Sequence, residues 1–254
     1  MRLCYNVSMT IITSKSNNLI KKTKKLRQKK YRQDSYLIEG WHLFEEARKS
    51  GAHFRHIFLL PDMVERVQEK GSLVLVSLDI LKEISDTPTP QGIVAEVVLE
   101  PVPLPNFSQG RYLVLEDIQD PGNLGTMIRT ADAAGLDGVI LSDKSADLYN
   151  PKTLRSMQGS HFHLPIYRSP LAEIFAEMKA ANLPILATTL AEHSLDYKSL
   201  GDLEKFALVM GNEGQGISQQ TAHVADQLIH ISMPGQAESL NVAVAAGIVL
   251  FSLL

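Results

Sequence analysis

Three separated stretches of the chain carry polar side chains of the kind that bind ligands or move protons, and each follows an apolar segment. The first runs from Asp120 to Arg129, the second from Gly211 to Gly216, and the third from Met233 to Asn241. Loops that follow the strands of an open α/β sheet meet at one edge, where such folds bind their ligands. The order of the stretches therefore predicts one composite pocket.

In the first stretch, Pro121 and Gly122 favour a turn, and Asn123 is a suitable cap for the helix that follows. Arg129 lies six residues further on, one to two turns inside that helix. Its planar guanidinium would hold a phosphate or a ribose, or it would form an ion pair with Asp132. The residues alone leave both interpretations of Arg129 open.

The second stretch holds Gly211, Gly214 and Gly216 directly after the apolar segment 206–210. Glycine lets a ligand approach the backbone closely. Glu213 stands between these glycines with little apolar cover, which favours a functional role over that of a surface-turn residue. The sequence contains neither the Gly-x-x-x-x-Gly-Lys-Ser/Thr phosphate loop nor the Gly-x-Gly-x-x-Gly dinucleotide motif. Kinase, GTPase and ordinary nicotinamide functions are therefore disfavoured.

In the third stretch, Ser239 is expected to cap the last helix, with Asn241 in its first turn. The small residues at 242–247 would permit close packing, in a crowded core or at a dimer seam. A merely well-capped buried helix is the alternative. Thr188 and Thr189, at the end of another expected strand, either line the same pocket or cap the next segment.

Positive charge is concentrated at the start of the chain. Ten of the 25 Lys and Arg residues lie within residues 1–33, which hold no Asp or Glu, so the remainder carries 15 basic against 28 acidic residues. Such a segment is typical of a phosphate-backbone contact, although a solvated helix face or a tail has the same composition. Interleaved apolar residues favour a helix over 16–31. The residues expected to contact a nucleic acid are Lys21, Lys22, Lys24, Lys25, Lys29, Lys30 and Arg32.

Composition excludes several other classes of protein. A single cysteine, Cys4, permits no disulfide within the chain, which favours a reducing, cytoplasmic compartment. The longest apolar run, 242–254, is too short to cross a bilayer. Residues 1–8 are interpreted as an upstream leader, and they lack the apolar core of a signal peptide. No Cys/His cluster has zinc-ligand spacing, and His161 and His163 would point to opposite faces of a strand.

The elements that must position these residues form two expected domains. Residues 10–98 have the pattern of a small α/β domain, and a proline-rich linker is expected at 99–109. Residues 110–254 alternate regularly between strand and helix, which predicts an α/β fold with a mostly parallel sheet covered on both faces.

The three stretches, taken in order, resemble the SpoU/TrmH family of RNA ribose 2′-O-methyltransferases. The matching motifs are Asp-Pro-Gly-Asn-Leu-Gly-Thr-Met-Ile-Arg-Thr-Ala at 120–131, Met-Gly-Asn-Glu-Gly-Gln-Gly at 210–216, and Met-Pro followed by Ser-Leu-Asn-Val-Ala-Val-Ala. Residues 156–165 resemble the central segment of the family, where Ala is commoner than Ser160. The N-terminal part is similar to a substrate-binding domain of many members, itself similar to small ribosomal RNA-binding proteins.

This resemblance implies a deep C-terminal trefoil knot, S-adenosylmethionine as methyl donor, and a homodimer whose active site draws on both chains. It places the cofactor against Gly211, Met233 and Leu240, with Thr188 and Thr189 at the adenosine rim. The implied reaction and substrate cluster is Asn123, Arg129, Glu213, Ser239 and Asn241. The turn at 232–235 departs from the more usual Ile-Pro-Met turn of the family.

The expected reaction is methylation of a ribose 2′-hydroxyl, on ribosomal RNA in preference to transfer RNA. Because a guanidinium stays protonated in proteins, Arg129 is expected to orient the ribose and its phosphate rather than to act as a base. One alternative is a non-catalytic RNA-binding or ribosome-assembly protein on the same fold. Another is a small-molecule enzyme of ordinary doubly wound type.

Overall fold

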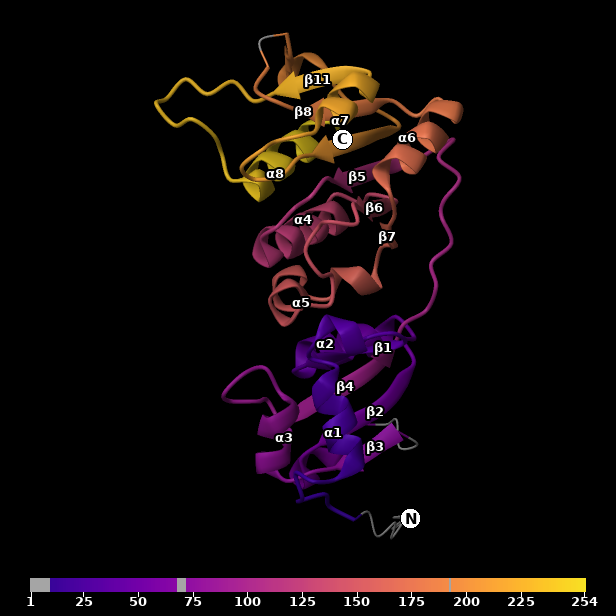
Figure 1. Cartoon of the computed structure of the whole chain (residues 1–254), viewed down its shortest axis with the longest axis vertical. Helices are drawn as coiled ribbons and strands as arrows, with labels where there is room; N and C mark the ends of the chain where they lie inside the picture. Colours follow the sequence, from indigo (N-terminus) through magenta and orange to yellow (C-terminus); the bar gives the residue numbers. More distant parts are fainter. Residues whose placement is uncertain (1–9, 68–71, 192) are drawn as a thin grey trace. The chain divides into compact units, whose positions relative to one another are not determined.

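The chain folds into two compact units, of which the first ends at Glu100 and the second begins at Pro101 (Figure 1). The computed structural model describes residues 10–67, 72–191 and 193–254. The segment interpreted as a leader, 1–8, lies outside the described residues. We call the two parts unit 1 and unit 2 and describe each by itself.

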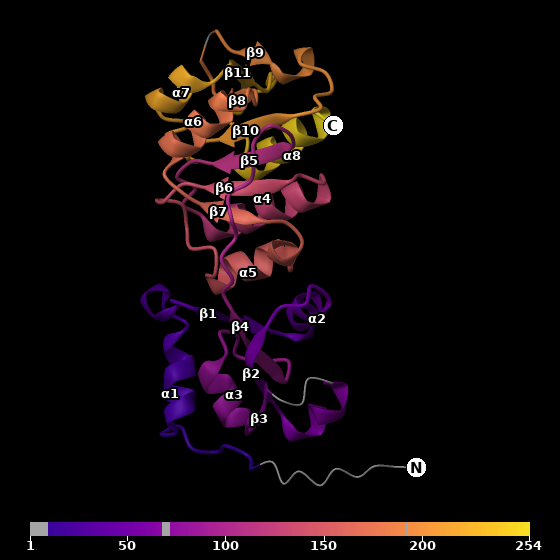
Figure 2. The ribbon, with the colours of Figure 1, turned by 90° about the vertical axis from the view of Figure 1, so that its right-hand side faces the viewer.

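Unit 1 is built on a four-stranded sheet in which β4 lies between two antiparallel neighbours. In sheet order its strands are β1 (Ser35–Glu39), β4 (Ile93–Val98), β2 (Phe54–Leu59) and β3 (Leu73–Leu75). Its helices are α1 (Asn18–Lys25), α2 (Trp41–Lys49) and α3 (Leu78–Ile84), with 3-10 turns at Lys29–Tyr31 and Pro61–Arg66. Helices α1 and α3 lie on one face of the sheet and α2 on the other (Figure 2).

The basic helix is shorter than the sequence predicts. The expectation was a helix over 16–31, but α1 ends at Lys25 and the chain turns before a 3-10 turn at 29–31. Ile20 and Thr23 are its buried positions, and none of residues 24–31 is buried. Because packing of an apolar face supplies most helix stability in proteins, the helix stops where that contact stops.

Unit 2 is an α/β unit with a seven-stranded sheet whose pairings are all parallel. In sheet order its strands are β7 (Ile166–Arg168), β6 (Gly138–Leu141), β5 (Arg111–Leu115), β10 (Phe206–Met210), β8 (Ile185–Thr188), β11 (Gln227–His230) and β9 (Leu195–Asp196). The two-residue strand β9 was not expected. This architecture agrees with the predicted mostly parallel sheet.

Five α-helices cover the two faces of this sheet. They are α4 (Pro121–Ala133), α5 (Pro151–Met157), α6 (Leu171–Ala180), α7 (Gln219–Val224) and α8 (Val242–Ser252). Helices α6 and α7 lie on one side, and α4 and α8 on the other (Figure 2). Helix α5 packs on α4 at Gly125, where a Cβ atom would lie 2.5 Å from the carbonyl oxygen of Thr153. Only glycine permits that approach.

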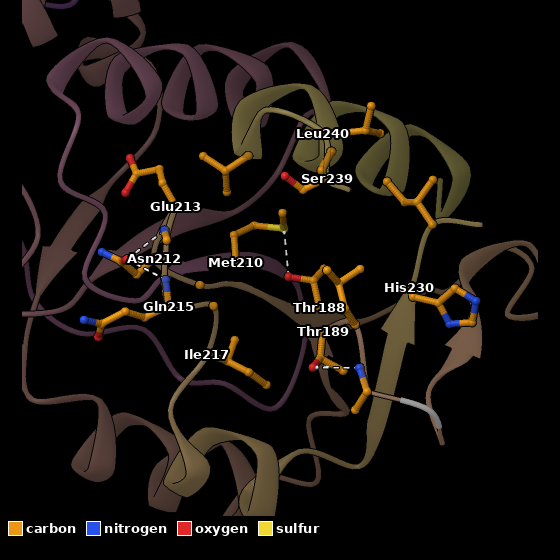
Figure 3. A pocket seen from close by; sticks show the side chains of 18 of the residues that line it. Thr188, Thr189, Met210, Asn212, Glu213, Gln215, Ile217, His230, Ser239 and Leu240 are labelled. Atoms are coloured by element: carbon orange, nitrogen blue, oxygen red, sulfur yellow. Dashed lines mark hydrogen bonds between the residues drawn. The ribbon is translucent and has the colours of Figure 1, made fainter. Parts of the chain in front are cut away.

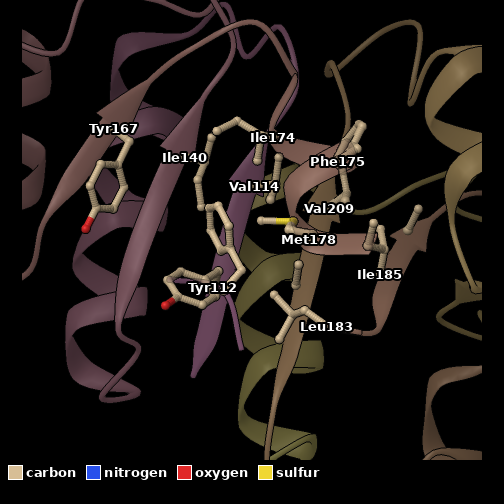
Figure 4. Packing of buried hydrophobic residues seen from close by; sticks show 13 residues of the cluster. Tyr112, Val114, Ile140, Tyr167, Ile174, Phe175, Met178, Leu183, Ile185 and Val209 are labelled. Atoms are coloured by element: carbon tan, nitrogen blue, oxygen red, sulfur yellow. The ribbon is translucent and has the colours of Figure 1, made fainter. Parts of the chain in front are cut away.

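The core under α6 consists of buried aliphatic and aromatic side chains, with Tyr112 and Tyr167 at one end (Figure 4). Val114, Ile140 and Val209 of three neighbouring strands are completely buried there, together with Ile174 and Met178 of α6. Burying one such side chain contributes about 2 kcal/mol. Phe107, inside the expected linker, also belongs to this core, and its ring centroid lies 5.1 Å from that of Tyr112.

This sheet determines where the three polar stretches meet. Strands β5, β10 and β8 are neighbours and parallel, so the loops that follow them emerge at the same edge. The loop after β5 leads into α4, and the loop after β10 carries the glycines. In the described part of the chain, no helix is long and apolar enough to span a membrane.

Candidate active site

Glu213 ties the first two polar stretches together. Its carboxylate accepts hydrogen bonds from the backbone N–H of Gln119 (3.1 Å) and of Asp120 (3.0 Å), and from Nδ2 of Asn123 (3.2 Å). The loop after β10 is thereby fixed to the first turn of α4. Glu213 therefore connects two loops and is more than a surface-turn residue.

Asn241 joins the third stretch to the same cluster. Its Nδ2 donates to Oδ1 of Asn123 at 3.0 Å, while its Oδ1 accepts from the N–H groups of Ala243 (2.9 Å) and Val244 (3.3 Å). One amide thus caps α8 and reaches α4. Glu213, Asn123 and Asn241 form a continuous hydrogen-bonded chain, although they lie far apart in sequence.

Two expected helix caps are wrong. Asp120, not Asn123, caps α4, because its Oδ1 accepts from the N–H of Asn123 at 2.9 Å. Asn241, not Ser239, caps α8, because the helix starts three residues later than expected. In both places two residues of the capping types lie within four positions of each other, and only the tertiary contacts decide which one has the capping backbone angles.

A cavity of about 590 Å³ lies beside this cluster (Figure 3). Its walls come from the loop after β8, the glycine loop after β10, and residues 229–245. Seven residues singled out from the sequence line it: Thr188, Thr189, Gly211, Glu213, Met233, Ser239 and Leu240. Asn123, Asn241 and Arg129 do not line it.

Gly211 lines the cavity and packs directly on the backbone of the turn that follows. A Cβ atom there would lie 2.2 Å from the carbonyl carbon of Gly216 and 2.4 Å from the amide nitrogen of Ile217, closer than real contacts allow. The turn is held by Asn212, whose Oδ1 accepts from the N–H groups of Gly214 (2.9 Å) and Gln215 (3.0 Å). Glycine is required here for space, since only a bare backbone fits.

Arg129 projects from the exposed face of α4. The alternative in which it pairs with Asp132 is wrong, since Oδ2 of Asp132 lies 2.8 Å from Nδ1 of His163 instead. Among the residues that the structure describes, Arg129 has no side-chain hydrogen bond or ion pair. It is therefore available to a ligand.

The carboxylates of the cluster are stabilised in their charged form. Partial burial raises the pKa of Glu213, but the hydrogen bonds from Gln119 and Asp120 together outweigh burial and lower it below its ordinary value. The ion pair with Lys152, at 2.6 Å, and the N–H of Asn123 lower the pKa of Asp120. Glu213 is thus an anchor for N–H groups and a poor proton acceptor at neutral pH.

Some residues of the site had no usable signal in the sequence. His230 lines the cavity, and its ring joins Oγ of Ser194 (2.9 Å from Nδ1) to Oγ of Ser232 (3.3 Å from Nε2). Asp120 is visible only as part of a turn. Met210 and Ile217 line the cavity as well, but in sequence they are ordinary apolar residues.

The basic residues of unit 1 separate into two groups. Lys24 pairs with Glu83, which also binds Lys15 at 3.1 Å, and Arg27 pairs with Asp86 at 3.4 Å. Within the described residues, no acidic partner is found for Lys21, Lys22, Lys25, Lys29 and Lys30, which are all exposed. Nζ of Lys25 and of Lys30 lie 5.4 and 5.0 Å from the ring centroid of Tyr31.

No metal centre is found in the described ranges, where no group of three or more His, Cys, Asp or Glu side chains converges. His161 is half-buried in a 3-10 turn (Ser160–Phe162), where desolvation of its ring and the neighbouring His163 lower its pKa to about 3. It is therefore a neutral packing residue at physiological pH.

Comparison with known proteins matches both units. Residues 110–251 match the SpoU rRNA Methylase family, and residues 17–95 match the MRM3-like substrate binding domain. The chain is 42% identical to the 23S rRNA (guanosine(2553)-2′-O)-methyltransferase RlmP of Bacillus subtilis (strain 168), across 96% of this chain and 99% of that protein. It is 32% identical to the 23S rRNA (guanosine-2′-O-)-methyltransferase RlmB of Escherichia coli (strain K12), across 85% and 97%.

Solved structures agree with these relatives. The crystal structure of the AdoMet-bound rRNA methyltransferase from Sinorhizobium meliloti superposes with a TM-score of 0.86 at 33% identity, covering 96% of each chain. The SpoU methyltransferase AviRb from Streptomyces viridochromogenes, in complex with AdoMet, has a TM-score of 0.77 at 27% identity, covering 93% of this chain and 96% of that one.

Proposed function

Because the chain belongs to the SpoU rRNA methylase family, we propose that it transfers a methyl group from S-adenosylmethionine to a ribose 2′-hydroxyl of ribosomal RNA. The observation that carries this proposal is the chain Glu213–Asn123–Asn241 beside the cavity. It joins three distant loops where a methyl donor and a ribose must meet. A small-molecule enzyme would not need the lysine-rich face of unit 1.

The cavity fits the cofactor. Its volume of about 590 Å³ lies in the range of small-molecule sites, and the close packing of Gly211 on the turn at Gly216 fixes the backbone that lines it. We assign Gly211, Met233 and Leu240 to cofactor contact, with Thr188 and Thr189 at the rim. When bound, S-adenosylmethionine supplies an activated methyl group, so positioning by the protein should provide much of the acceleration.

Arg129 and the polar cluster would position the RNA. Arg129 holds the phosphate beside the target ribose and stabilises negative charge as it develops on the 2′-oxygen. Asn123, Ser239 and Asn241 supply hydrogen-bonding groups at the edge of the cavity, and Glu213 keeps Asn123 in place. Removing one stabilising donor of this kind typically lowers kcat about 100-fold or more.

We also propose a homodimer that forms on α8. Ala243 and Ala246 are buried, and Gly247 lies beside Thr130 of α4, so the small residues pack within the chain. A neighbouring side of α8 leaves large apolar residues exposed, namely Val244 (52%), Ile248 (37%) and Phe251 (56%), and Leu240 (38%) is exposed just before the helix. A helix that is apolar on every side is normally covered. A second copy of the chain is the proposed partner for this surface. Arg129 precedes Thr130, which contacts α8, and it does not line the cavity of its own chain. A dimer formed on α8 would therefore bring Arg129 close to the cavity of the partner. A Val244→Asp variant should be monomeric by light scattering.

The trefoil knot of this fold family is part of the same proposal. The segment from β11 to α8 reaches the cavity, forms part of its wall, and then packs on α4 and next to β10. In a knotted C-terminus the last part of the chain has to run back beside an earlier loop. Here the C-terminal segment runs beside the glycine loop, which supports the proposal. We assign unit 1, residues 10–98, to RNA binding, with its unpaired lysines on the phosphate backbone.

Complementation tests the shared site. If Arg129 serves the cavity of the partner, Gly211→Ala and Arg129→Ala subunits, each inactive alone, should recover about a quarter of wild-type activity when mixed and reassembled, since half of the dimers then hold one complete site. If both residues act within one chain, mixing restores nothing.

The function itself is tested with ribosomal RNA from cells that lack the gene. The purified full chain and labelled S-adenosylmethionine should methylate this RNA at a ribose, and mapping of ribose methylation should locate one position that is unmodified in those cells. A protein that binds neither cofactor by calorimetry nor methylates this RNA would instead be a non-catalytic ribosome-assembly factor.

A further inference from the structure

Four polar side chains lie on the solvent side of α4, Arg129 among them, and the other three are engaged within the chain. The hydroxyl of Thr126 donates to the carbonyl oxygen of Gly122 (2.8 Å), and that of Thr130 donates to the carbonyl oxygen of Thr126 (2.9 Å). The carboxylate of Asp132 accepts from Nδ1 of His163 at 2.8 Å. Within the chain as described, only the guanidinium of Arg129 keeps all its donors available.

Asp132 is the natural competitor for this guanidinium. Residues three apart on a helix are surface neighbours, and an Arg and an Asp at that spacing attract each other. An Arg129–Asp132 pair would place a carboxylate where an RNA phosphate has to bind. The side chain of Asp132 is 26% exposed and that of His163 is 42% exposed, so the interaction that prevents this pairing lies at the surface.

His163 is held in place by the segment before it. Gln158 and Gly159 both have positive φ angles (51° and 95°), which turn the chain sharply after α5. The 3-10 turn Ser160–Phe162 follows, with Nδ1 of the half-buried His161 shielded from solvent, and the N–H of His163 donates to the carbonyl oxygen of Ser160 at 3.0 Å. This segment is not used by the mechanism above, yet it directs one imidazole at the carboxylate beside Arg129.

We infer that His163 is a positioning residue for the reaction: by binding Asp132, it keeps Arg129 free to hold the phosphate of the RNA substrate. The inference rests on the role proposed for Arg129. It adds a requirement that the motif residues alone do not meet: the carboxylate of Asp132, one helical turn from Arg129, must be bound by another group.

The test is a set of variants of the full chain, assayed for methyl transfer from S-adenosylmethionine to ribosomal RNA from cells that lack the gene. His163→Ala should raise the KM for this RNA about three- to fivefold, the range of an exposed charge pair, with kcat close to wild type. Cofactor affinity by calorimetry should stay unchanged, which shows that the variant is folded. His163→Asn should behave as wild type, because its Nδ2 takes nearly the place of the ring Nδ1.

Two double variants decide the cause. Adding Asp132→Asn to His163→Ala should restore the KM, since no carboxylate remains to capture Arg129. In an Arg129→Ala background, removing His163 should not raise the KM for this RNA any further. A loss that persists with Asp132→Asn, or one that is equally large without Arg129, overturns the inference. Wild-type activity of Arg129→Ala alone would instead refute the proposed role of the arginine.

Discussion

The loop cluster of unit 2 and the basic helix of unit 1 use polar residues in opposite ways. In the cluster, Glu213, Asn123 and Asn241 bind one another and the backbone, so each fixes the position of the next. On α1 and the turn after it, five lysines extend from the surface without acidic partners among the described residues. The first arrangement is organised before a ligand arrives, whereas the second offers only charge.

This difference has energetic consequences. The hydrogen bonds of the cluster are cooperative, so the loss of one donor or acceptor disturbs all three loops. Exposed lysines act almost independently, and each contributes a small, salt-dependent increment to binding of a polyanion. Substitutions in the cluster should therefore have large and specific effects, and substitutions on α1 small and additive ones.

The largest effect is expected for Gly211→Ala. The new Cβ would meet the backbone of Gly216 and Ile217, and neither can give way without moving the floor of the cavity. Affinity for S-adenosylmethionine, measured by calorimetry, should fall about 100-fold or more. Gly214→Ala in the same turn is the control, because its Cβ would have only Oδ1 of Asn212 at 3.7 Å, and its affinity should stay within a few-fold of wild type. Equal affinities for the two variants would contradict the close-approach role of Gly211.

Glu213→Gln comes next. An amide has one acceptor oxygen, and its NH₂ group must face the N–H of either Gln119 or Asp120, where the carboxylate now accepts. Leaving such a group unsatisfied costs about 1–3 kcal/mol, and a comparable loss of transition-state stabilisation lowers kcat/KM about 10- to 100-fold. Glu238→Gln, which changes an exposed carboxylate on the same cavity, should retain activity within about threefold. Similar losses in both variants would mean that cavity charge, not loop anchoring, is what matters.

The lysines of unit 1 give a smaller and graded effect. Replacing Lys21, Lys25, Lys29 and Lys30 with Gln should weaken RNA binding and reduce the slope of log K against log salt by about 0.7 to 0.9 for each RNA phosphate that is no longer neutralised. Lys15 and Lys24, both paired with Glu83, form the matched control. Changing these two should alter the slope less per residue. An unchanged slope in the first set would place the RNA on another surface.

The smallest effect concerns acid titration. Because the folded-state pKa of Glu213 lies below its ordinary value, its charged form stabilises unit 2. That contribution is complete above the ordinary pKa of a glutamate and is lost as the pH falls through the lowered value. Carbon-13 titration of the carboxyl group should show the lowered pKa directly. Asn123→Ala removes one of the three donors and should raise it; a Glu213 that titrates as a free glutamate would show that the loops are not joined in solution.

Much of this site could be anticipated from the sequence. Three polar turns after apolar segments predict neighbouring loops, since parallel strands align their carboxyl ends. Charge counting identifies the basic segment. Which side chains pair could not be anticipated, because Asp132 and His163 are 31 residues apart. Nor could the caps of α4 and α8, where two suitable residues lie two or three positions apart.

The amino-acid order by itself determined the two-unit α/β organisation, the glycines that leave room for a ligand, and the accumulation of lysine at one end, because these depend on periodicity and composition. Only the tertiary structure decided that Glu213 anchors two backbone N–H groups, that Arg129 has no partner among the described residues while Asp132 binds His163, and that α8 exposes a second apolar side. Those outcomes depend on distances of a few ångströms between residues far apart in the chain, and short-range hydrogen bonds form only where the packed sheet brings their donors and acceptors together.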